Sequence, residues 1–495
     1  MRVESHLLFL YDLRNTDYTG VEIIKRSLVI YIVIGTIFLG LIVLFLGLGK
    51  NLVPIAGYAL PAHSTIIIAP PTSTSHAVLA EWLQNLQKPL SMLFLQIIII
   101  LAASKLMGSL ATKIGQPSVI GEIVAGIALG PSLFGLLFPA GYGFLFPKES
   151  LVNLQFLSQF GLLFFMFIVG MELDLTKLKN KAYNAIVVSH ASIVVPYFLG
   201  VVLSYFIFER LAPAGTSFIA FALFMGIAMS ITAFPVLARI LHERNLTKSS
   251  LGTLALTCAA ADDITAWCML AAVIAIIKAG GMATAWVMIA MAIIFVLVMF
   301  YLVRPALLHF SKREDGKSKF RKSTIAMAFL TLLGSAYVAE LIGIHALFGG
   351  FIAGVIMPHT IRFKELMTEK VEDVSVLVLL PIFFALTGIR TEIGLLNSCY
   401  LWAICAITIL LAILGKFGGA SVASRMVGSN WKDALSIGAL MNTRGLMELI
   451  VLNIGYELGI LSPQIFAIMV IMALMTTFMT GPSLNLINRF SARLS

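Results

Sequence analysis

The hydrophobic positions of this chain fall into long, continuous blocks that are separated by short polar segments. A block of about 18 or more apolar residues can cross a bilayer as an α-helix. The blocks do not alternate with period two, as the strands of a membrane β-barrel would. The pattern therefore predicts an all-α polytopic membrane protein with about fourteen transmembrane helices. The predicted spans are residues 27–48, 91–110, 118–136, 152–171, 184–208, 217–241, 250–278, 284–303, 323–342, 345–359, 373–389, 399–420, 433–455 and 463–485.

Composition favours a membrane protein over a soluble one. Hydrophobic residues make up 59% of the 495 residues and charged residues only 12%, whereas soluble domains average about half and about a quarter. The net charge of +10 does not indicate a nucleic-acid partner, because the basic residues lie in short loops between the blocks. The four cysteines lack the spacing of a metal site or a disulfide framework. We expect no cofactor and no enzymatic activity.

The basic residues are concentrated in alternate loops. Cytoplasmic loops are enriched in Lys and Arg, so the loops that carry them are placed in the cytoplasm together with both termini. The absence of a targeting peptide and of long tails is typical of a bacterial inner membrane protein. The basic residues on this side include Arg2, Arg14, Lys25, Arg26, Lys177, Lys179, Lys181, Arg244, Lys248, Arg313, Lys317, Lys319, Arg321, Lys322, Arg362, Lys364, Lys370, Arg425, Lys432, Arg489 and Arg493.

The chain contains an internal repeat. Residues 121–126 (GEIVAG) resemble 349–354 (GGFIAG), and the stretch 162–170 resembles 381–388 after a one-residue gap. These segments pair the third span with the tenth and the fourth with the eleventh. An odd offset places the two copies in opposite orientations. The sequence therefore predicts inverted-topology repeats, which are typical of alternating-access transporters.

The same offset pairs the sixth span with the thirteenth, and both are interrupted. The sixth contains SITAFP at 230–235, in which Pro235 removes a backbone donor. The thirteenth contains MNTRG at 441–445. Irregular backbone at membrane depth is tolerated only where it faces protein or a water-filled cavity. Two crossing discontinuous helices in matching positions indicate a binding site near the middle of the membrane.

Two adjacent carboxylates, Asp262 and Asp263, lie in the middle of the seventh span. Each carries an insertion cost of roughly 2.5–3.5 kcal/mol at a helix centre. A buried carboxylate beside a second one can hold either a proton or a cation, which is the minimum needed for proton-coupled cation transport. Lys416 is the lone cation within the twelfth span and is expected to pair with one of them. Ser230 and Thr232 are candidate oxygen ligands, although hydroxyls in a helix often bond to their own backbone.

Other charged side chains within or near the spans are candidates for core or gate charges. Arg444 and Glu448 are four residues apart, which favours a local pair on one helix. Glu172 and Arg390 occupy matching positions of the two repeats, near the ends of their spans. We interpret these two as gate or interface charges.

Three motifs in a fixed order carry a family resemblance. They are SITAFPVLARIL at 230–241, LTCAAADDITAWCMLA at 256–271 and MNTRGLMELIVLNIG at 441–455, with a lone lysine in the span before the last. Over roughly residues 90–490, the chain resembles the monovalent cation:proton antiporters. That family includes Kef-type efflux systems, bacterial sodium/proton exchangers with an Asp-Asp motif and the plant CHX exchangers, and the CHX-like branch is the most similar.

The resemblance implies a homodimer in which each protomer has a dimerisation domain and a mobile core that moves like an elevator. It implies that Asp263 binds a monovalent cation and a proton in turn. It also implies that Asp262 forms a salt bridge with Lys416, which breaks or loosens when the cation binds. Thr232 and Asn442 would lie where the two interrupted spans cross.

The expected organisation has three parts. Residues 1–26 form a cytoplasmic segment, 27–90 an extra helix with an external loop, and 91–490 the exchanger domain, without the C-terminal nucleotide-binding domain of Kef-type systems. The expected partners are a second copy, membrane lipids, monovalent cations and protons. The choice between Na⁺ and K⁺ stays open. An ion-coupled organic-solute transporter of the same inverted-repeat architecture is the alternative.

Overall fold

The structure is a computed structural model that describes residues 35–49, 85, 88–172, 182–244, 246, 249–278, 282–312, 322–358, 371 and 373–494. Within these ranges the chain forms helices and their connections, and no strand occurs. The prediction of an all-α protein is therefore confirmed. The predicted segment 1–26 lies outside the described residues, as does most of the predicted external loop.

The helices follow one another along the whole described chain. Beside the N-terminal helix Gly35–Gly49, they are α3 (Pro89–Lys113), α4 (Ser118–Leu129), α5 (Phe134–Leu137), α6 (Pro139–Leu145), α7 (Lys148–Glu172), α9 (Ala182–Leu211), α10 (Phe218–Ser230), α11 (Phe234–Glu243), α12 (Ser250–Lys278), α13 (Met282–Val298), η1 (Met299–Val303), α14 (Arg304–Lys312), α15 (Lys322–Ile342), α16 (Ala346–Ile356), η2 (Ser375–Leu379), α18 (Leu380–Ile389), η3 (Ile393–Leu395), α19 (Cys399–Ile413), η4 (Leu414–Gly418), α20 (Gly419–Met426), α21 (Trp431–Met441), α22 (Leu446–Glu457) and α23 (Pro463–Leu494).

The helices have the length and composition of an integral membrane protein. Within the described residues, 11 helical segments are long and apolar enough to cross a bilayer. Three further apolar helices are shorter, namely Gly35–Gly49, Phe218–Ser230 and Ala346–Ile356. Each predicted span coincides with one of these long or short segments. The number of about fourteen crossings stays a prediction, because the short helices fall below the length of a full span.

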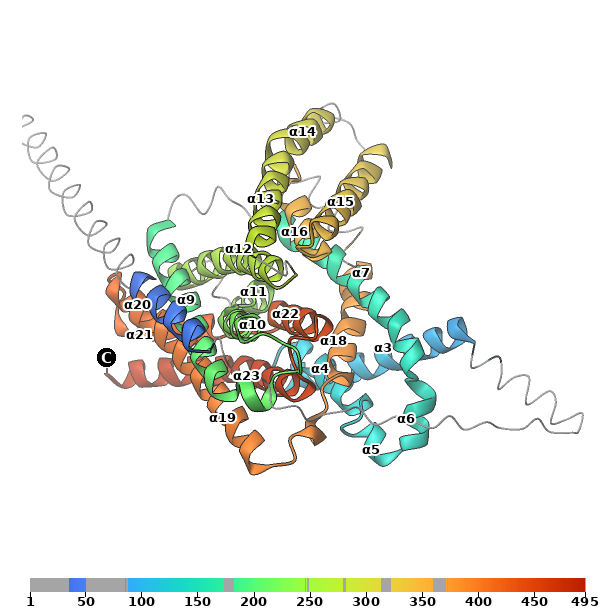
Figure 1. Ribbon diagram of the computed structural model, residues 1–495. Coiled ribbons are helices and arrows are strands. Elements are labelled where there is room, and N and C mark those ends of the chain that lie inside the picture. The colour runs from blue at the N-terminus through green and yellow to red at the C-terminus, as the bar shows by residue number, and fades with distance from the viewer. Residues whose placement is uncertain are drawn as a thin grey trace, which may run out of the picture.

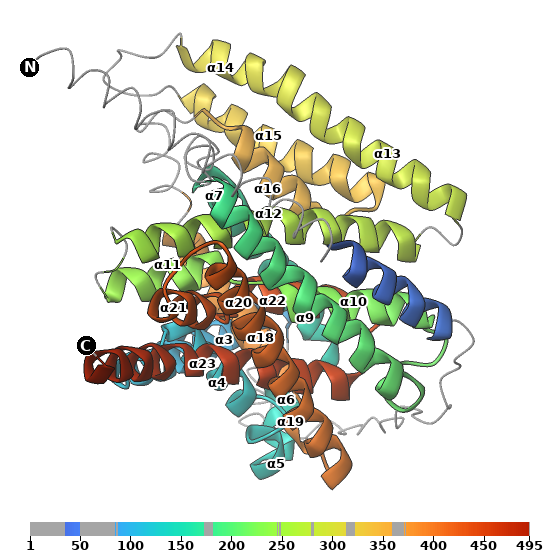
Figure 2. The ribbon, with the colours of Figure 1, turned by 90° about the vertical axis from the view of Figure 1, so that its left-hand side faces the viewer.

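The interrupted helices lie in the middle of the bundle. Figure 1 shows α10, α11 and α22 surrounded by the other helices, and Figure 2 shows α13, α14 and α15 along one edge. The side chains of α10 and α22 are buried along almost their whole length. By contrast, α13 and its continuation expose many large apolar side chains, among them Trp286, Ile293 and Leu302. Their exposed faces are suited to contact with lipid.

Two glycines at equivalent positions of the two repeats make close contacts with neighbouring helices. A Cβ atom on Gly126 of α4 would overlap the carbonyl of Ala385 in α18. In the other repeat, a Cβ atom on Gly354 of α16 would overlap the carbonyl of Phe167 in α7. Small residues let membrane helices approach at backbone distance. The third and tenth spans thus make equivalent contacts with the eleventh and fourth, as the inverted-topology repeat predicts.

Candidate functional site

Two helix breaks meet at the centre of the structure. α10 ends at Ser230, the chain is extended through Ile231, and α11 begins at Phe234. The second break separates α21 from α22. The two are joined directly, because the backbone N–H of Ala233 donates to the carbonyl of Thr443 at 3.2 Å. The predicted crossing of two discontinuous helices is therefore confirmed.

A glycine makes the second break possible. Gly445 has φ 152° and ψ −128°, a conformation that residues with a side chain rarely adopt. A Cβ atom there would also lie 2.9 Å from Cγ2 of Val236 in α11. The glycine therefore allows the chain to turn from α21 into α22 while it packs against the other broken helix.

Two cations cap the last carbonyls of α10, which have no partner within the helix. Arg444 donates to the carbonyl of Ala228 at 3.0 Å and to that of Met229 at 2.5 Å. Lys416 donates to the next carbonyl, that of Ser230. The last carbonyls of a helix have no partner within it and carry partial negative charge. Two buried cations therefore stabilise a helix end that lies inside the protein.

The side chain of Lys416 is fully buried, and each of the three hydrogens of its ammonium group has an acceptor. Its ammonium group also donates to the carbonyl of Ser192 at 3.2 Å and to Oδ2 of Asp262 at 3.4 Å. Both side chains of this salt bridge are inaccessible to solvent. Lys416 lies in η4, a π-helical turn between α19 and α20, a feature often found at functional sites.

Asp262 is surrounded by hydrogen-bond donors. Ser189 and Ser192 of α9 donate to its two oxygens at 2.5 Å and 2.9 Å. Thr232, in the first helix break, donates to Oδ2 at 2.6 Å. These donors and the ammonium group of Lys416 occupy both oxygens of the carboxyl group. Asp262 is therefore compensated by partners within the protein interior.

Asp263 has the opposite environment. Its side chain is also fully buried, but no described residue makes a hydrogen bond of normal geometry to either of its oxygens. Adjacent residues on an α-helix point about 100° apart, which explains how two neighbouring carboxylates face different surroundings. An ionised carboxylate that is buried without donors is energetically unfavourable, and binding a proton or a cation removes this cost.

Another buried ion pair lies beside the crossing. Nη1 of Arg444 and Oε1 of Glu448 are 3.3 Å apart on consecutive turns, and both side chains are inaccessible to solvent. Glu448 lies in the first turn of α22, where the partial positive charge of the helix favours an acid. Thr477 of α23 holds the backbone of Arg444, since it accepts from the N–H at 3.2 Å and donates to the carbonyl at 2.8 Å.

The remaining candidates are placed as follows. The hydroxyl of Ser230 bonds back to the carbonyl of Ile227 at 2.9 Å, so this residue offers Lys416 its backbone carbonyl. Asn442 is buried at the end of α21, and its Oδ1 has no partner among the described residues. Glu172 ends α7, and its side chain is not among those described.

Arg390 lies away from the two aspartates, just after α18. It forms an ion pair with Glu457 at 3.0 Å and a hydrogen bond with Asn453 at 2.8 Å, both on α22. Gln159 of α7 donates to the same glutamate at 3.2 Å. These contacts join α22 to two neighbouring helices of the repeats, which suits an interface charge.

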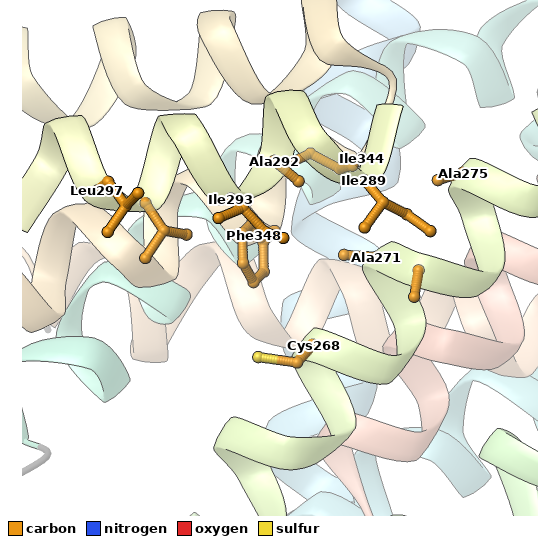
Figure 3. Close-up of a pocket in the computed structure, with 11 residues that line it drawn as sticks. Cys268, Ala271, Ala275, Ile289, Ala292, Ile293, Leu297, Ile344 and Phe348 are labelled. Carbon is orange, nitrogen blue, oxygen red and sulfur yellow. The ribbon is translucent and has the colours of Figure 1, made fainter. Parts of the chain in front are cut away.

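A separate apolar pocket of about 290 Å³ lies between α12, α13 and α16. Figure 3 shows Ala271 and Ala275 of α12 facing Ile289 and Ile293 of α13 across it. Cys268 supplies the one sulfur atom, and the other lining side chains are apolar. A wall of this composition offers no oxygen ligands for a cation, so the pocket is not a candidate ion site.

Comparison with known proteins assigns the chain to a family. Residues 97–489 match the family described as "Sodium/hydrogen exchanger, transmembrane". The Na(+)/H(+) antiporter NhaS4 of Synechocystis is 45% identical over 394 residues, which cover 79% of this chain and 96% of that protein. The chain belongs to the sodium/hydrogen exchanger family. The resemblance of its three motifs to the cation:proton antiporters is thereby confirmed, whereas the expected greater similarity to the CHX-like branch is not, because the plant cation/H(+) antiporter 17 is 39% identical and NhaS4 45%.

Other members of this exchanger family are more distant or longer. Cation/H(+) antiporter 17 of Arabidopsis is 39% identical over 85% of this chain, and K(+)/H(+) antiporter 1 of Saccharomyces cerevisiae is 32% identical over 81%. The chain spans only 51% and 47% of these two relatives. The solved structure of the sodium proton antiporter MjNhaP1 from Methanocaldococcus jannaschii has a TM-score of 0.59 at 15% identity, covering 80% of this chain and 99% of that one. This likeness shows a shared exchanger fold.

Ser189 and Ser192 also contact Asp262 and are not among the residues predicted from the sequence. They lie in the fifth span as part of the stretch SHAS, one turn apart on a helix that is otherwise largely apolar. Two hydroxyls at that spacing share one face of a helix, and this was a usable signal. What the sequence lacked was the contact of α9 with α12, which brings both hydroxyls to Asp262.

Proposed function

We propose that this member of the exchanger family is a secondary antiporter that exchanges Na⁺ or K⁺ for H⁺. The observation that carries the proposal is that the buried Asp263 accepts no hydrogen bond of normal geometry from the described residues, whereas both oxygens of the neighbouring Asp262 have partners. In the proposed cycle Asp263 binds the cation and the proton in turn. Thr232 and Asn442, at the two helix breaks, are candidates to supply further oxygens.

The balance of buried charge supports exchange at one group. The charged side chains fully buried among the described residues are three acids, Asp262, Asp263 and Glu448, and two bases, Lys416 and Arg444. If all five are ionised, one negative charge is in excess. Either one proton or one monovalent cation on Asp263 neutralises it, and binding both would create an excess positive charge. Uncompensated charge in a low-dielectric interior is strongly unfavourable.

We further propose an elevator-type cycle in a homodimer, with a mobile core and a dimerisation part within residues 91–490. The inverted repeat and the two crossing broken helices support alternating access around a central site. The distribution of Lys and Arg supports cytoplasmic termini, and the cyanobacterial relative supports a bacterial inner membrane. The relatives are named for Na⁺ and for K⁺, so both ions belong in the test.

The test uses purified protein in liposomes with an internal pH dye and an imposed proton gradient. Na⁺, K⁺, Li⁺ and an organic cation are added separately to wild type, to Asp263→Asn and to Asp433→Asn. The last variant is the control, because it makes the same chemical change near the surface, at the start of α21. We expect an alkali cation to drive proton movement in wild type and in the control, but not in Asp263→Asn.

Two outcomes would count against the proposal. If no alkali cation moves protons in a folded, reconstituted wild type, the antiporter function is wrong. Proton movement driven instead by the organic cation would favour the organic-solute alternative. If Asp263→Asn exchanges as fast as wild type, the antiporter stands but Asp263 is not its exchanging group.

A further inference from the structure

The apolar pocket between α12, α13 and α16 is elongated along the helices that form it (Figure 3). On α12 its lining residues are Cys268, Ala271, Ala272 and Ala275, whose spacing places them on one face of the helix. On α13 the lining residues fall within Ile289–Leu297, a stretch of about 12 Å at 1.5 Å per residue. The pocket therefore has the shape of a channel that follows the two helices for about two turns.

The pocket is accessible from the surface that faces lipid. Cys268 is exposed, as are Ile293 and Leu297 on the opposite wall, and few residues of the span Trp286–His309 are buried. A dry apolar cavity of about 150 Å³ already binds benzene, and this pocket, at about 290 Å³, is roughly twice as large. In a membrane, the molecules that surround such an opening are the acyl chains of lipids.

A lysine lies at one end of the pocket. Lys278, in the last turn of α12, follows Ala275 by three residues and so continues the same face of the helix. A Cβ atom on Gly343 would lie 3.9 Å from Cδ of Lys278 and 2.5 Å from Cε of Met288. Both Gly343 and Met288 directly precede residues that line the pocket. Lys278 is exposed and forms no ion pair with a described residue, so its charge is free to bind an anion.

We propose that the pocket binds one acyl chain of an anionic phospholipid, whose phosphate group is held by Lys278. Apart from the thiol of Cys268, the lining side chains are apolar, which suits a hydrocarbon chain. The cation at its end suits a phosphate group at the membrane surface. Because α12 and α13 contact each other, a helix of about 10 Å in diameter cannot enter between them, whereas a single chain can. This proposal goes beyond the antiporter function and does not depend on it.

The first experiment uses the purified full chain in micelles with photoactivatable lipids. A phosphatidylglycerol with a diazirine in one acyl chain is irradiated, and the labelled peptides are identified by mass spectrometry. A phosphatidylcholine with the same acyl chains tests the headgroup. We expect the phosphatidylglycerol to label the pocket-lining parts of α12 and α13, and the phosphatidylcholine to label them about fivefold less. One lysine near the membrane surface contributes about this factor to the binding of anionic lipid.

Two variants test the two ends of the site. Lys278→Ala should weaken labelling by phosphatidylglycerol about fivefold. Its control is Lys148→Ala, which removes another exposed lysine at a helix end, the start of α7. Ala271→Leu should weaken labelling at least about tenfold, because its added carbons displace methylene groups of the chain, each of which contributes a factor of about four. Its control is Ala290→Leu, which adds the same group on the exposed side of α13, outside the pocket.

A second measurement follows the melting temperature of the protein as phosphatidylglycerol is added to the micelles. A ligand that binds only the folded state raises the melting temperature. The increase should be present in wild type and in both controls, and it should be smaller in Lys278→Ala and Ala271→Leu. If Ala271→Leu does not fold, Lys278→Ala still decides the question, because an exposed side chain is removed.

Three outcomes would overturn the proposal. Equal labelling by the two lipids, with no effect of Lys278→Ala, would mean that only unspecific lipid at the protein surface is detected. Undiminished labelling in a folded Ala271→Leu would place the chain outside the pocket. Labelling that is absent from α12 and α13 would do the same. None of these measurements involves transport, so a wild type that exchanges no ions would contradict the proposed function and leave the lipid site standing.

Discussion

The buried pair of Arg444 and Glu448 makes a quantitative prediction about stability. Arg444 forms two hydrogen bonds to carbonyls of α10 and an ion pair with Glu448 at 3.3 Å, and both side chains are inaccessible to solvent. Replacing it in Arg444→Met leaves a buried carboxylate without its partner. Breaking a buried pair in this way destabilises proteins by about 3–5 kcal/mol. This loss of stability arises because the remaining charge stays buried without a partner, whereas the intact pair itself contributes little net stability.

The second substitution tests this reasoning. Glu448→Gln in the Arg444→Met background removes the orphan charge, so the double variant should recover at least about 1 kcal/mol relative to the sum of the two single effects. The assay is unfolding of the purified protein in mixed micelles by increasing SDS, followed by circular dichroism. Arg425→Met is the matched control. Arg425 bonds to the carbonyl of Ser429 at 2.8 Å near the surface and should cost no more than about 1 kcal/mol.

Additivity would refute the argument. If the effects of Arg444→Met and Glu448→Gln simply add within about 0.5 kcal/mol, the two side chains do not interact as the 3.3 Å separation indicates. A loss of less than about 1 kcal/mol for Arg444→Met would be equally damaging, because it would mean that the end of α10 needs no cap.

Two further predictions concern competition and packing. Because a proton and a cation are proposed to compete for Asp263, the apparent KM for the cation should rise by up to about tenfold for each unit that the pH falls, with little change in the maximal rate. A constant KM with a falling maximal rate would contradict this competition. Gly354→Ala should destabilise the protein by about 1–3 kcal/mol, because the new Cβ atom would overlap the carbonyl of Phe167. The control Gly334→Ala, on the exposed face of α15, has open space around the new Cβ atom and should stabilise the protein by about 0.5–1 kcal/mol. Equal melting temperatures for the two variants would argue against the close contact of α16 with α7.

The sequence was sufficient for the large-scale architecture because membrane insertion depends mainly on length and hydrophobicity. Apolar blocks gave the positions of the spans, and Pro235 and Gly445 marked the two breaks. The repeat predicted which spans correspond, and the packing of Gly126 and Gly354 agrees with it. Each of these signals is local in the chain or compares two segments of it.

The sequence was insufficient for the directions of side chains. A helix buried on every side, such as α10, is apolar all around and gives no amphipathic pattern from which to read its faces. For this reason the sequence could not tell that the hydroxyl of Ser230 turns back to Ile227, whereas that of Thr232 reaches Asp262. Nor could it reveal the serines of α9, because their role depends on a contact between helices about 70 residues apart.

If Asp263 is the exchanging group, as proposed, the charge balance of the site predicts that the protein exchanges ions and does not leak them. With a proton or a monovalent cation on Asp263, the five buried charged groups and their ligand sum to zero. With Asp263 empty, one negative charge is uncompensated, and carrying it through a low-dielectric interior costs several kcal/mol. Each 1.4 kcal/mol lowers the population of the crossing state about tenfold. The empty protein should therefore change sides at least about a hundredfold less often than either loaded form, so that a proton must replace each cation before the cycle continues.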